Sequence, residues 1–300
     1  MAQMVMKEHK RGKLKSMKIG DWVIVMVCVF MILVCLLPIL NVFSRSLSSP
    51  LAIIQGKVTF WPVNPTLESY TYVLKDKAFG SSMLWTGVLT VICTVISLTI
   101  TSLCAYPLTY DWLKGNKLIN TIIILTMYFN AGTIPNYIWL QSLGLINNPW
   151  VLILPGCLSV FNMIVLRSFF FSLPESIRES AELDGANPYT ILIRIYLPLS
   201  TSVLATLALF YAVGRWNGFT DALLYITKPE LVPIQMKLYQ VINNLSSIEI
   251  ATVENNGSMP NTSDGIKAAT VMFATVPILI VYPWLQRYFI AGVTVGAVKG

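Results

Sequence analysis

Charged residues are scarce in this sequence. Asp, Glu, Lys and Arg make up 12% of its 300 residues, whereas a soluble globular domain typically carries about 25%. So few charged side chains cannot cover a water-facing surface. Hydrophobic residues make up 55% of the chain and the mean hydropathy is +0.66. Most of the chain is therefore expected to lie in a membrane.

Residues that bind metals or carry catalysis are also few. The single histidine, His9, lies in a basic segment at the amino terminus, and the five cysteines lie in apolar runs without CxxC spacing. We therefore predict neither a metal site nor a disulfide framework. No Ser–His pair and no pair of Asp residues lies within an apolar run, so we predict no catalytic residue and disfavour a membrane enzyme.

The phosphate-binding sequence G-x-x-x-x-G-K-[S/T] is absent. Neither Gly12-Lys13 nor Gly56-Lys57 has a glycine five residues before its own glycine. We expect no cofactor in this chain. If its activity is driven by ATP, then ATP and Mg²⁺ would be bound by a separate ATPase.

Long apolar runs dominate the rest of the sequence. About 20 apolar residues cross a bilayer as a helix, and six runs approach this length. They are Trp22 to Phe43, Met83 to Leu108, Leu118 to Leu140, Pro149 to Phe171, Ser200 to Trp216, and Ala268 to Phe289. The third and fifth runs are interrupted by polar residues. The prediction is an all-α integral membrane protein with about six transmembrane helices.

The basic residues set the expected orientation. Residues 1–20 form a basic tail that precedes the first apolar run, as is typical of a cytoplasmic anchor facing anionic lipid rather than of nucleic-acid binding. With this tail inside, most Lys and Arg residues fall on the cytoplasmic side, and an even number of spans makes both termini cytoplasmic. An external loop is then expected at about 220–265. We predict a multi-pass protein of a prokaryotic plasma membrane.

A charged segment at about 174–198 lies between the fourth and fifth expected spans. Four of its residues are spaced to share one helical face: Glu175, Arg178, Glu179 and Glu182. Gly185 and the Asn187-Pro188 pair would then end that helix. The pattern predicts a helix, a turn at glycine and a second helix at the cytoplasmic surface. The pattern alone does not distinguish this arrangement from a solvated connector.

The same segment resembles the EAA loop of ABC importer permeases, which reads E-A-A-x-x-x-G, nine residues, then I-x-L-P. Here Glu179-Ser180-Ala181 precedes Gly185, and Ile195-x-Leu197-Pro198 follows at the same spacing. Ser180 replaces the usual first alanine. Asp184-Gly185-Ala186 and the end of the chain are similar to carbohydrate-uptake permeases related to the smaller membrane subunit of the maltose importer. Other stretches are similar to a subgroup for complex-polysaccharide or aldouronate uptake: Phe129 to Pro135, Leu143 to Leu145, Phe161-Asn162, Arg167 to Phe170 and Arg215 to Asn217.

This resemblance implies a type I ABC importer permease fold over residues 21–300. It implies partners: a second homologous permease, two ATPase subunits and an extracellular solute-binding protein. It also implies that the cargo is a carbohydrate, such as oligosaccharides from complex polysaccharides. The residues expected to couple the chain to the ATPase are Glu179, Ala181, Glu182, Asp184, Gly185, Lys299 and Gly300.

Polar and aromatic residues within the apolar runs are candidates for the substrate path. They are Tyr128, Asn130, Asn136, Trp139, Asn162 and Tyr211. Sugars offer hydroxyl groups to Asn and flat faces to aromatic rings. The alternative is that the Asn residues bond across helices and the aromatic residues lie at the membrane interface.

Two other functions stay open from the sequence. One is an ABC permease for a non-sugar solute, against which the Asp184-Gly185-Ala186 form argues. The other is a secondary transporter, which would need ion ligands within the membrane and no EAA loop.

Overall fold

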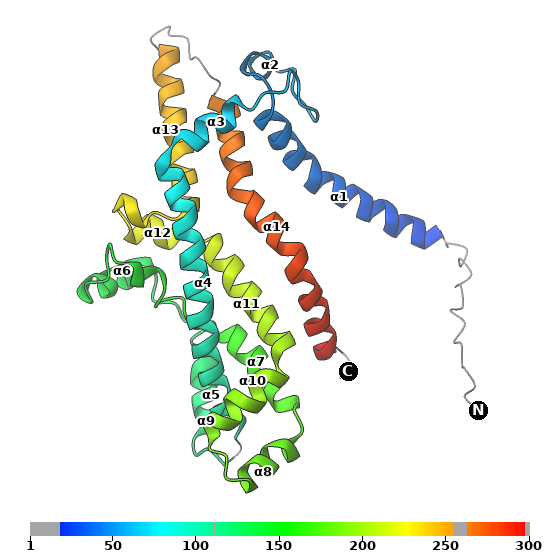
Figure 1. Ribbon diagram of the computed structural model, residues 1–300, viewed down its shortest axis with the longest axis vertical. Coiled ribbons are helices and arrows are strands. Elements are labelled where there is room, and N and C mark those ends of the chain that lie inside the picture. Colours follow the sequence, from blue (N-terminus) through cyan, green and yellow to red (C-terminus); the bar gives the residue numbers. More distant parts are fainter. Residues whose placement is uncertain (1–18, 111, 255–262, 298–300) are drawn as a thin grey trace.

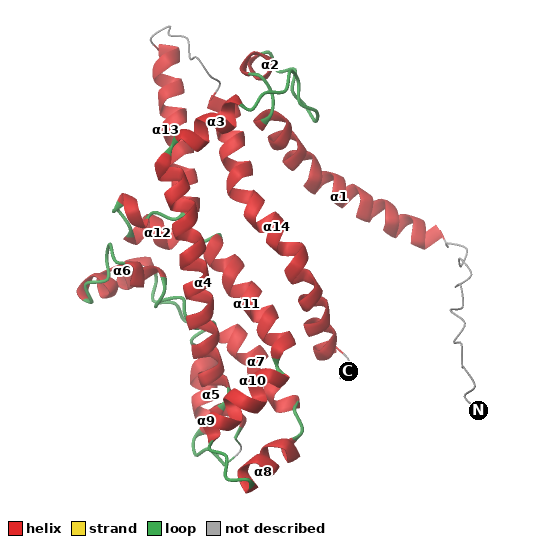
Figure 2. Ribbon diagram, viewed as in Figure 1, coloured by secondary structure: helices red, strands yellow, loops and turns green. Residues whose placement is uncertain are grey.

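The structure, a computed structural model, describes residues 19–110, 112–254 and 263–297. These residues form helices joined by short connections, with one isolated bridge between Ser48 and Pro65 (Figure 2). The longer helices are α1 (Ile19–Ser46), α4 (Lys77–Ala105), α11 (Thr201–Trp216), α13 (Ile234–Glu254) and α14 (Ser263–Ala297). Figure 1 shows α4 following the long axis of the molecule; α11 packs against α4, and α14 packs against α11.

The shorter elements gather mainly at the two ends of the molecule and at one side. They are α2 (Pro50–Ile54), α3 (Glu68–Lys75), η1 (Pro107–Thr109), α5 (Asn116–Leu125), α6 (Thr133–Ser142), η2 (Pro149–Leu152), α7 (Val160–Ser172), α8 (Glu175–Leu183), α9 (Pro188–Ile191), the π-helical η3 (Leu192–Tyr196), α10 (Leu197–Leu199), α12 (Thr220–Tyr225) and η4 (Pro229–Leu231). In Figure 1, α8 marks one end, and α2, α3 and the end of α13 mark the other.

Two of the six expected spans are not continuous helices, so those predictions are wrong. The run from Leu118 to Leu140 is split, because α5 ends at Leu125 and α6 begins only at Thr133. The break contains Gly132, whose φ of 93° lies outside the range that helices use. In the run from Pro149 to Phe171, the α-helix begins only at Val160, after the short helix η2 and a loop. Polar and glycine-rich breaks of this kind end helices that the apolar composition alone would extend.

By length and composition, fewer than the expected six elements are recognised as candidate spans in the described part of the chain, so the count of six stays a prediction. Among the described residues, three helices are long and apolar enough to cross a membrane: α1, α4 and the first part of α14. Up to five spans result if two bent pairs each count as one, α7 with α8 and the α9–α10 segment with α11, which bend by 75° and 85°. The fold is therefore all-helical with three to five candidate spans.

The end of the molecule opposite α8 is held by polar contacts between distant segments. Asp76 caps α4 by accepting a hydrogen bond from the Ala78 N–H at 2.9 Å, and it pairs with Lys237 of α13 at 3.0 Å. Arg45 at the end of α1 pairs with Asp264 at the start of α14 at 3.2 Å. The predicted external loop at 220–265 is largely helical, since it contains α12, η4 and α13.

Helix α1 packs on α14 but diverges from it towards its own amino-terminal end (Figure 1). None of the residues in its most apolar 18-residue stretch is buried within this chain. Large side chains on it are exposed, among them Trp22, Met26 and Phe30. Lipid or another protein must therefore cover most of α1.

Candidate functional site

The predicted coupling loop at 174–198 has the local structure that its sequence indicates. Helix α8 ends at Leu183, and Gly185 follows with φ of 82°. The N–H of Gly185 donates to the carbonyl of Glu182, and the N–H of Ala186 donates to that of Ala181. This pair of bonds is a Schellman motif, which requires a left-handed residue where glycine stands. The prediction of a helix, a glycine turn and a second helix is confirmed.

One side of α8 faces the protein and the other faces away from it. Ala181 is 8% exposed and packs into a core with residues of α4, α7, η3 and α11. Glu179, Glu182 and Leu183 are exposed, and Leu183 is 90% exposed. Helix α8 thus presents an acidic, partly apolar surface at one end of the fold.

The second half of the loop holds features that its sequence pattern did not predict. The Asn187 side chain caps α9 by accepting a hydrogen bond from the Thr190 N–H at 2.8 Å. Asn is a preferred N-cap residue, and Pro188 suits the first helical turn. Residues Leu192–Tyr196 are π-helical, a conformation found frequently at functional sites. Asn187 therefore starts the second helix as well as ending the turn.

A cavity of about 760 Å³ lies between α4, α7, α11 and α12. It contains two of the predicted path residues, Asn162 and Tyr211. Asn162 lies near the start of α7 and is 5% exposed. The Tyr211 hydroxyl bonds to the Thr101 hydroxyl at 2.7 Å and accepts from the Ser159 N–H at 3.1 Å. Tyr211 thus holds the cavity wall together, while Asn162 contributes its amide to the lining.

An ion pair gives this cavity its charged groups. Both Nη atoms of Arg215 bind the carboxylate of Asp221, Nη2 to Oδ1 at 3.1 Å, and Nη1 also donates to the Leu152 carbonyl at 2.8 Å. The Arg215 side chain is 9% exposed and that of Asp221 is 32% exposed. Neither was among the predicted path residues. Their signal in the sequence is an Arg and an Asp placed on either side of Gly218, where an apolar run ends.

The other four predicted path residues do not line this cavity. Tyr128 and Asn130 lie between α5 and α6, whereas Asn136 and Trp139 lie on α6. Tyr128 and Trp139 are exposed. Asn130 Oδ1 accepts a hydrogen bond from the Gly132 N–H at 2.9 Å within its own turn. The structure therefore separates these four residues from Asn162 and Tyr211.

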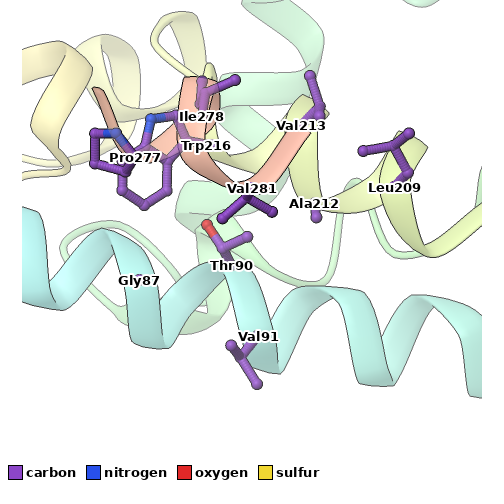
Figure 3. Close-up of a pocket in the computed structure, with 10 residues that line it drawn as sticks. All are labelled: Gly87, Thr90, Val91, Leu209, Ala212, Val213, Trp216, Pro277, Ile278 and Val281. Carbon is purple, nitrogen blue, oxygen red and sulfur yellow. The ribbon is translucent and has the colours of Figure 1, made fainter. Parts of the chain in front are cut away.

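A second cavity of about 290 Å³ lies between α4, α11 and α14 (Figure 3). Its lining is Gly87, Thr90, Val91, Leu209, Ala212, Val213, Trp216, Pro277, Ile278 and Val281. The hydroxyl of Thr90 is buried and has no hydrogen-bond partner. Among the described lining residues, Thr90 and Trp216 are the only ones with a polar side-chain group, so a sugar placed here would replace few of its hydrogen bonds to water. The cavity between α7 and α12 is the better candidate for a polar cargo.

The predicted coupling residues at the carboxyl end, Lys299 and Gly300, lie outside the described residues. Their role stays a prediction. So does the cytoplasmic position of the tail at 1–20, of which residues 1–18 are not described.

The sequence matches one protein family along nearly its whole length. Residues 14–295 match the family described as "binding-protein-dependent transport system inner membrane component". Two proteins of Bacillus subtilis strain 168 are also similar. LplC is 40% identical over 270 residues, which cover 89% of this chain and 90% of that protein. The polygalacturonan/rhamnogalacturonan transport system permease protein YtcP is 36% identical over 268 residues, with 89% and 94% covered.

A solved structure has the same arrangement of helices. It is a crystal structure of a bacterial ABC transporter involved in the import of the acidic polysaccharide alginate, and one of its chains superposes with a TM-score of 0.81. That chain is 33% identical, and the match covers 92% of this chain and 99% of the other. The overall fold of this chain is therefore that of a chain from a known ABC transporter.

Proposed function

Because this chain belongs to the family of binding-protein-dependent transport system inner membrane components, we propose that it forms half of the path by which an ATP-driven importer moves oligosaccharides. Family membership makes it a membrane-integral permease subunit of an ABC importer. The match over residues 14–295 is the observation that carries this conclusion. The location we propose is the plasma membrane of a prokaryotic cell, with both termini cytoplasmic.

The proposed cargo is an oligosaccharide that contains uronic acids. The names of two similar proteins support this, since polygalacturonan and rhamnogalacturonan contain uronic acids and alginate is named as an acidic polysaccharide. Saccharides of this kind combine hydroxyl groups with carboxylates. The polar cavity offers groups for both: the Asn162 amide and the Arg215–Asp221 pair.

The proposed path passes through that cavity. A uronate carboxylate would compete with Asp221 for Arg215, because guanidinium binds carboxylates in a bidentate manner. The ring of Phe161 also lines the cavity and is exposed, so it offers a flat apolar face to a sugar ring. For Tyr128, Asn130, Asn136 and Trp139, a place on the path remains a proposal that rests on the sequence.

Energy is proposed to enter through α8. Its exposed residues Glu179, Glu182 and Leu183 would contact an ATPase subunit, and the Schellman motif at Gly185 would hold α8 at a set angle to α9. Asp184 lies in that turn, and Lys299 and Gly300 would reach the same ATPase pair. ATP and Mg²⁺ would be bound by the ATPase, so this subunit would not itself be an enzyme.

The remaining proposed partners are a second, homologous permease and an extracellular solute-binding protein. The family description supports the binding protein. The exposure of α1 supports the second permease, because this helix diverges from α14 towards its amino-terminal end and offers an apolar surface along most of its length.

Reconstitution tests the proposed function. The chain, its partner permease and the ATPase would be placed in liposomes that contain ATP, with the binding protein and labelled oligogalacturonate outside. We expect uptake that requires both the binding protein and internal ATP, and weaker uptake of a neutral oligosaccharide of equal length. Uptake that follows an ion gradient without ATP would refute an ABC importer. Equal uptake of the neutral sugar would refute the acidic cargo alone.

A further inference from the structure

Arg178 is the one cation on α8, and its environment differs from that of a surface residue. Its side chain is 13% exposed, whereas those of Glu175 and Glu182, with which it forms ion pairs, are 67% and 46% exposed. Its guanidinium carbon lies 4.8 Å from the centre of the Tyr110 ring. Arg178 therefore points from α8 into the protein, while its acidic partners face outward.

Tyr110 belongs to a buried group of aromatic rings, which we name the aromatic cluster: Tyr106, Tyr110, Phe170 and Tyr196. Tyr106 caps the end of α4, Phe170 lies in α7 and Tyr196 ends η3. The Tyr106 and Tyr110 hydroxyls are 2.5 Å apart. All four rings are at most 5% exposed and meet mainly edge to face, a favourable geometry for aromatic pairs. The cluster thus joins α4, α7 and η3 directly behind α8.

The chain itself attaches α8 only through short turns. Leu173 and Pro174 precede it, and the turn at Gly185 follows it, with a bend of 75° between α7 and α8. Turns can act as hinges that absorb a rotation. Side-chain contacts therefore add to the Schellman motif in fixing the orientation of α8. The Ala181 methyl group provides close packing, and the Arg178–Tyr110 contact provides a directional one.

We propose that the Arg178–Tyr110 contact is a clasp that transmits movement of α8 to the aromatic cluster and so to α4, α7 and η3. Arg178 is then a positioning residue for transport and not a contact to the ATPase. This inference rests on the proposed function and adds a route by which the surface of α8 is connected to the helices. Glu175 and Glu182 balance the positive charge of Arg178 at the surface. The Tyr110 ring contacts the guanidinium on the side that faces the protein, as a cation–π partner.

The alternative is that Arg178 forms only ordinary ion pairs on the surface of α8, which contribute little to stability. The two alternatives differ in which partner of Arg178 matters. A clasp depends on the ring of Tyr110. A helix-surface pair depends on Glu175 and Glu182 and is indifferent to the ring.

The test uses the assembled complex in liposomes and measures uptake and ATP hydrolysis in the same vesicles. The variants are Arg178→Met, Tyr110→Leu, their combination, Tyr110→Phe, and Glu175→Gln, which removes an ion-pair partner of Arg178 that is not among the proposed ATPase contacts. Co-purification of the ATPase shows that each variant assembles. We expect Arg178→Met and Tyr110→Leu each to lower uptake per ATP by about 5-fold or more, and the combination to be no worse than either, since both break one contact. Tyr110→Phe and Glu175→Gln should retain most of the coupling.

Three results would overturn the clasp. Wild-type uptake per ATP in Arg178→Met is one, and additive losses in the combination are another. The third is equal loss in Tyr110→Phe and Tyr110→Leu, which would assign the effect to the hydroxyl instead of the ring. If Arg178→Met does not assemble, the comparison of Tyr110→Leu with Tyr110→Phe still shows whether coupling requires the Tyr110 ring. The wild-type complex separates this inference from the proposed function, because absence of ATP-driven uptake there would refute the latter.

Discussion

Arg215 is held by groups from two other segments of the chain. Arg215 lies in the last turn of α11, and its guanidinium binds Asp221 of α12 and the Leu152 carbonyl of η2. Removing one partner from a buried ion pair is costly, since the other charge is left without compensation. The arrangement also needs space, and Gly218 provides it. A Cβ atom at Gly218 would lie 2.2 Å from Nη2 of Arg215.

Gly218→Ala is expected to push the guanidinium away from Asp221. We predict a loss of about 1–3 kcal/mol in stability, the range for a hydrogen-bonded charged group that loses its partner, together with reduced uptake. Gly214→Ala is the matched control, because Gly214 lines the same cavity and a Cβ atom there would meet nothing within 4 Å. Thermal unfolding in detergent and uptake in liposomes measure the two effects. Indistinguishable behaviour of the two variants would show that the ion pair is unimportant.

An asparagine and a pair of stacked tyrosines join the short elements at the side of the molecule. Asn147 follows α6 with φ of 58°. Its Oδ1 atom accepts hydrogen bonds from the Thr227 N–H at 2.6 Å, the Thr227 hydroxyl at 2.9 Å and the Lys228 N–H at 3.1 Å. The Tyr137 ring of α6 also stacks on Tyr225 of α12, at 5.9 Å between centroids. The segments after α6 and after α12 therefore form one unit beside the polar cavity.

Asn147→Ala removes all three acceptor contacts and places a less suitable residue at positive φ. The expected loss is about 1–2 kcal/mol, because net hydrogen bonds at partly exposed positions contribute modestly. Asn147→Asp keeps the acceptor oxygen and should stay close to wild type, while Asn147→Gly keeps the backbone conformation and isolates the loss of the contacts. Thermal unfolding of the three variants measures this. Similar midpoints for Asn147→Ala and Asn147→Asp would contradict the role assigned to Oδ1.

The sequence predicts elements best where the determining pattern is local. The coupling loop was predictable because helix spacing, Gly185 and Pro188 all act within a few residues of one another. The split of the third expected span was only partly visible, since Asn130 and Gly132 marked a break but not the place where α6 would lie. The Arg215–Asp221 pair was not predicted, because the turn at Gly218 and the approach of η2 depend on tertiary packing.

Helix α1 shows how the whole molecule depends on what surrounds it. Cys28 and Cys35 on this helix are both exposed. They are seven residues apart, so they lie on the same helical face. We predict that an apolar crosslinker attached at either thiol captures the second permease in the assembled complex. Replacement of both by Ala should abolish the crosslink, and Cys93, which is buried, serves as the internal control. Reaction with lipid alone would contradict a permease partner along this face of α1.

The central claim is that ATP-driven movement reaches this permease through α8 and its glycine turn. The most direct measurement is uptake and ATP hydrolysis by reconstituted complexes that contain Gly185→Pro. Proline fixes φ near −65°, whereas Gly185 has φ of 82° and donates a backbone hydrogen bond to Glu182. We predict normal membrane insertion, no uptake, and loss of the ATP hydrolysis that substrate stimulates. Wild-type uptake by this variant, at equal membrane levels, would contradict the claim.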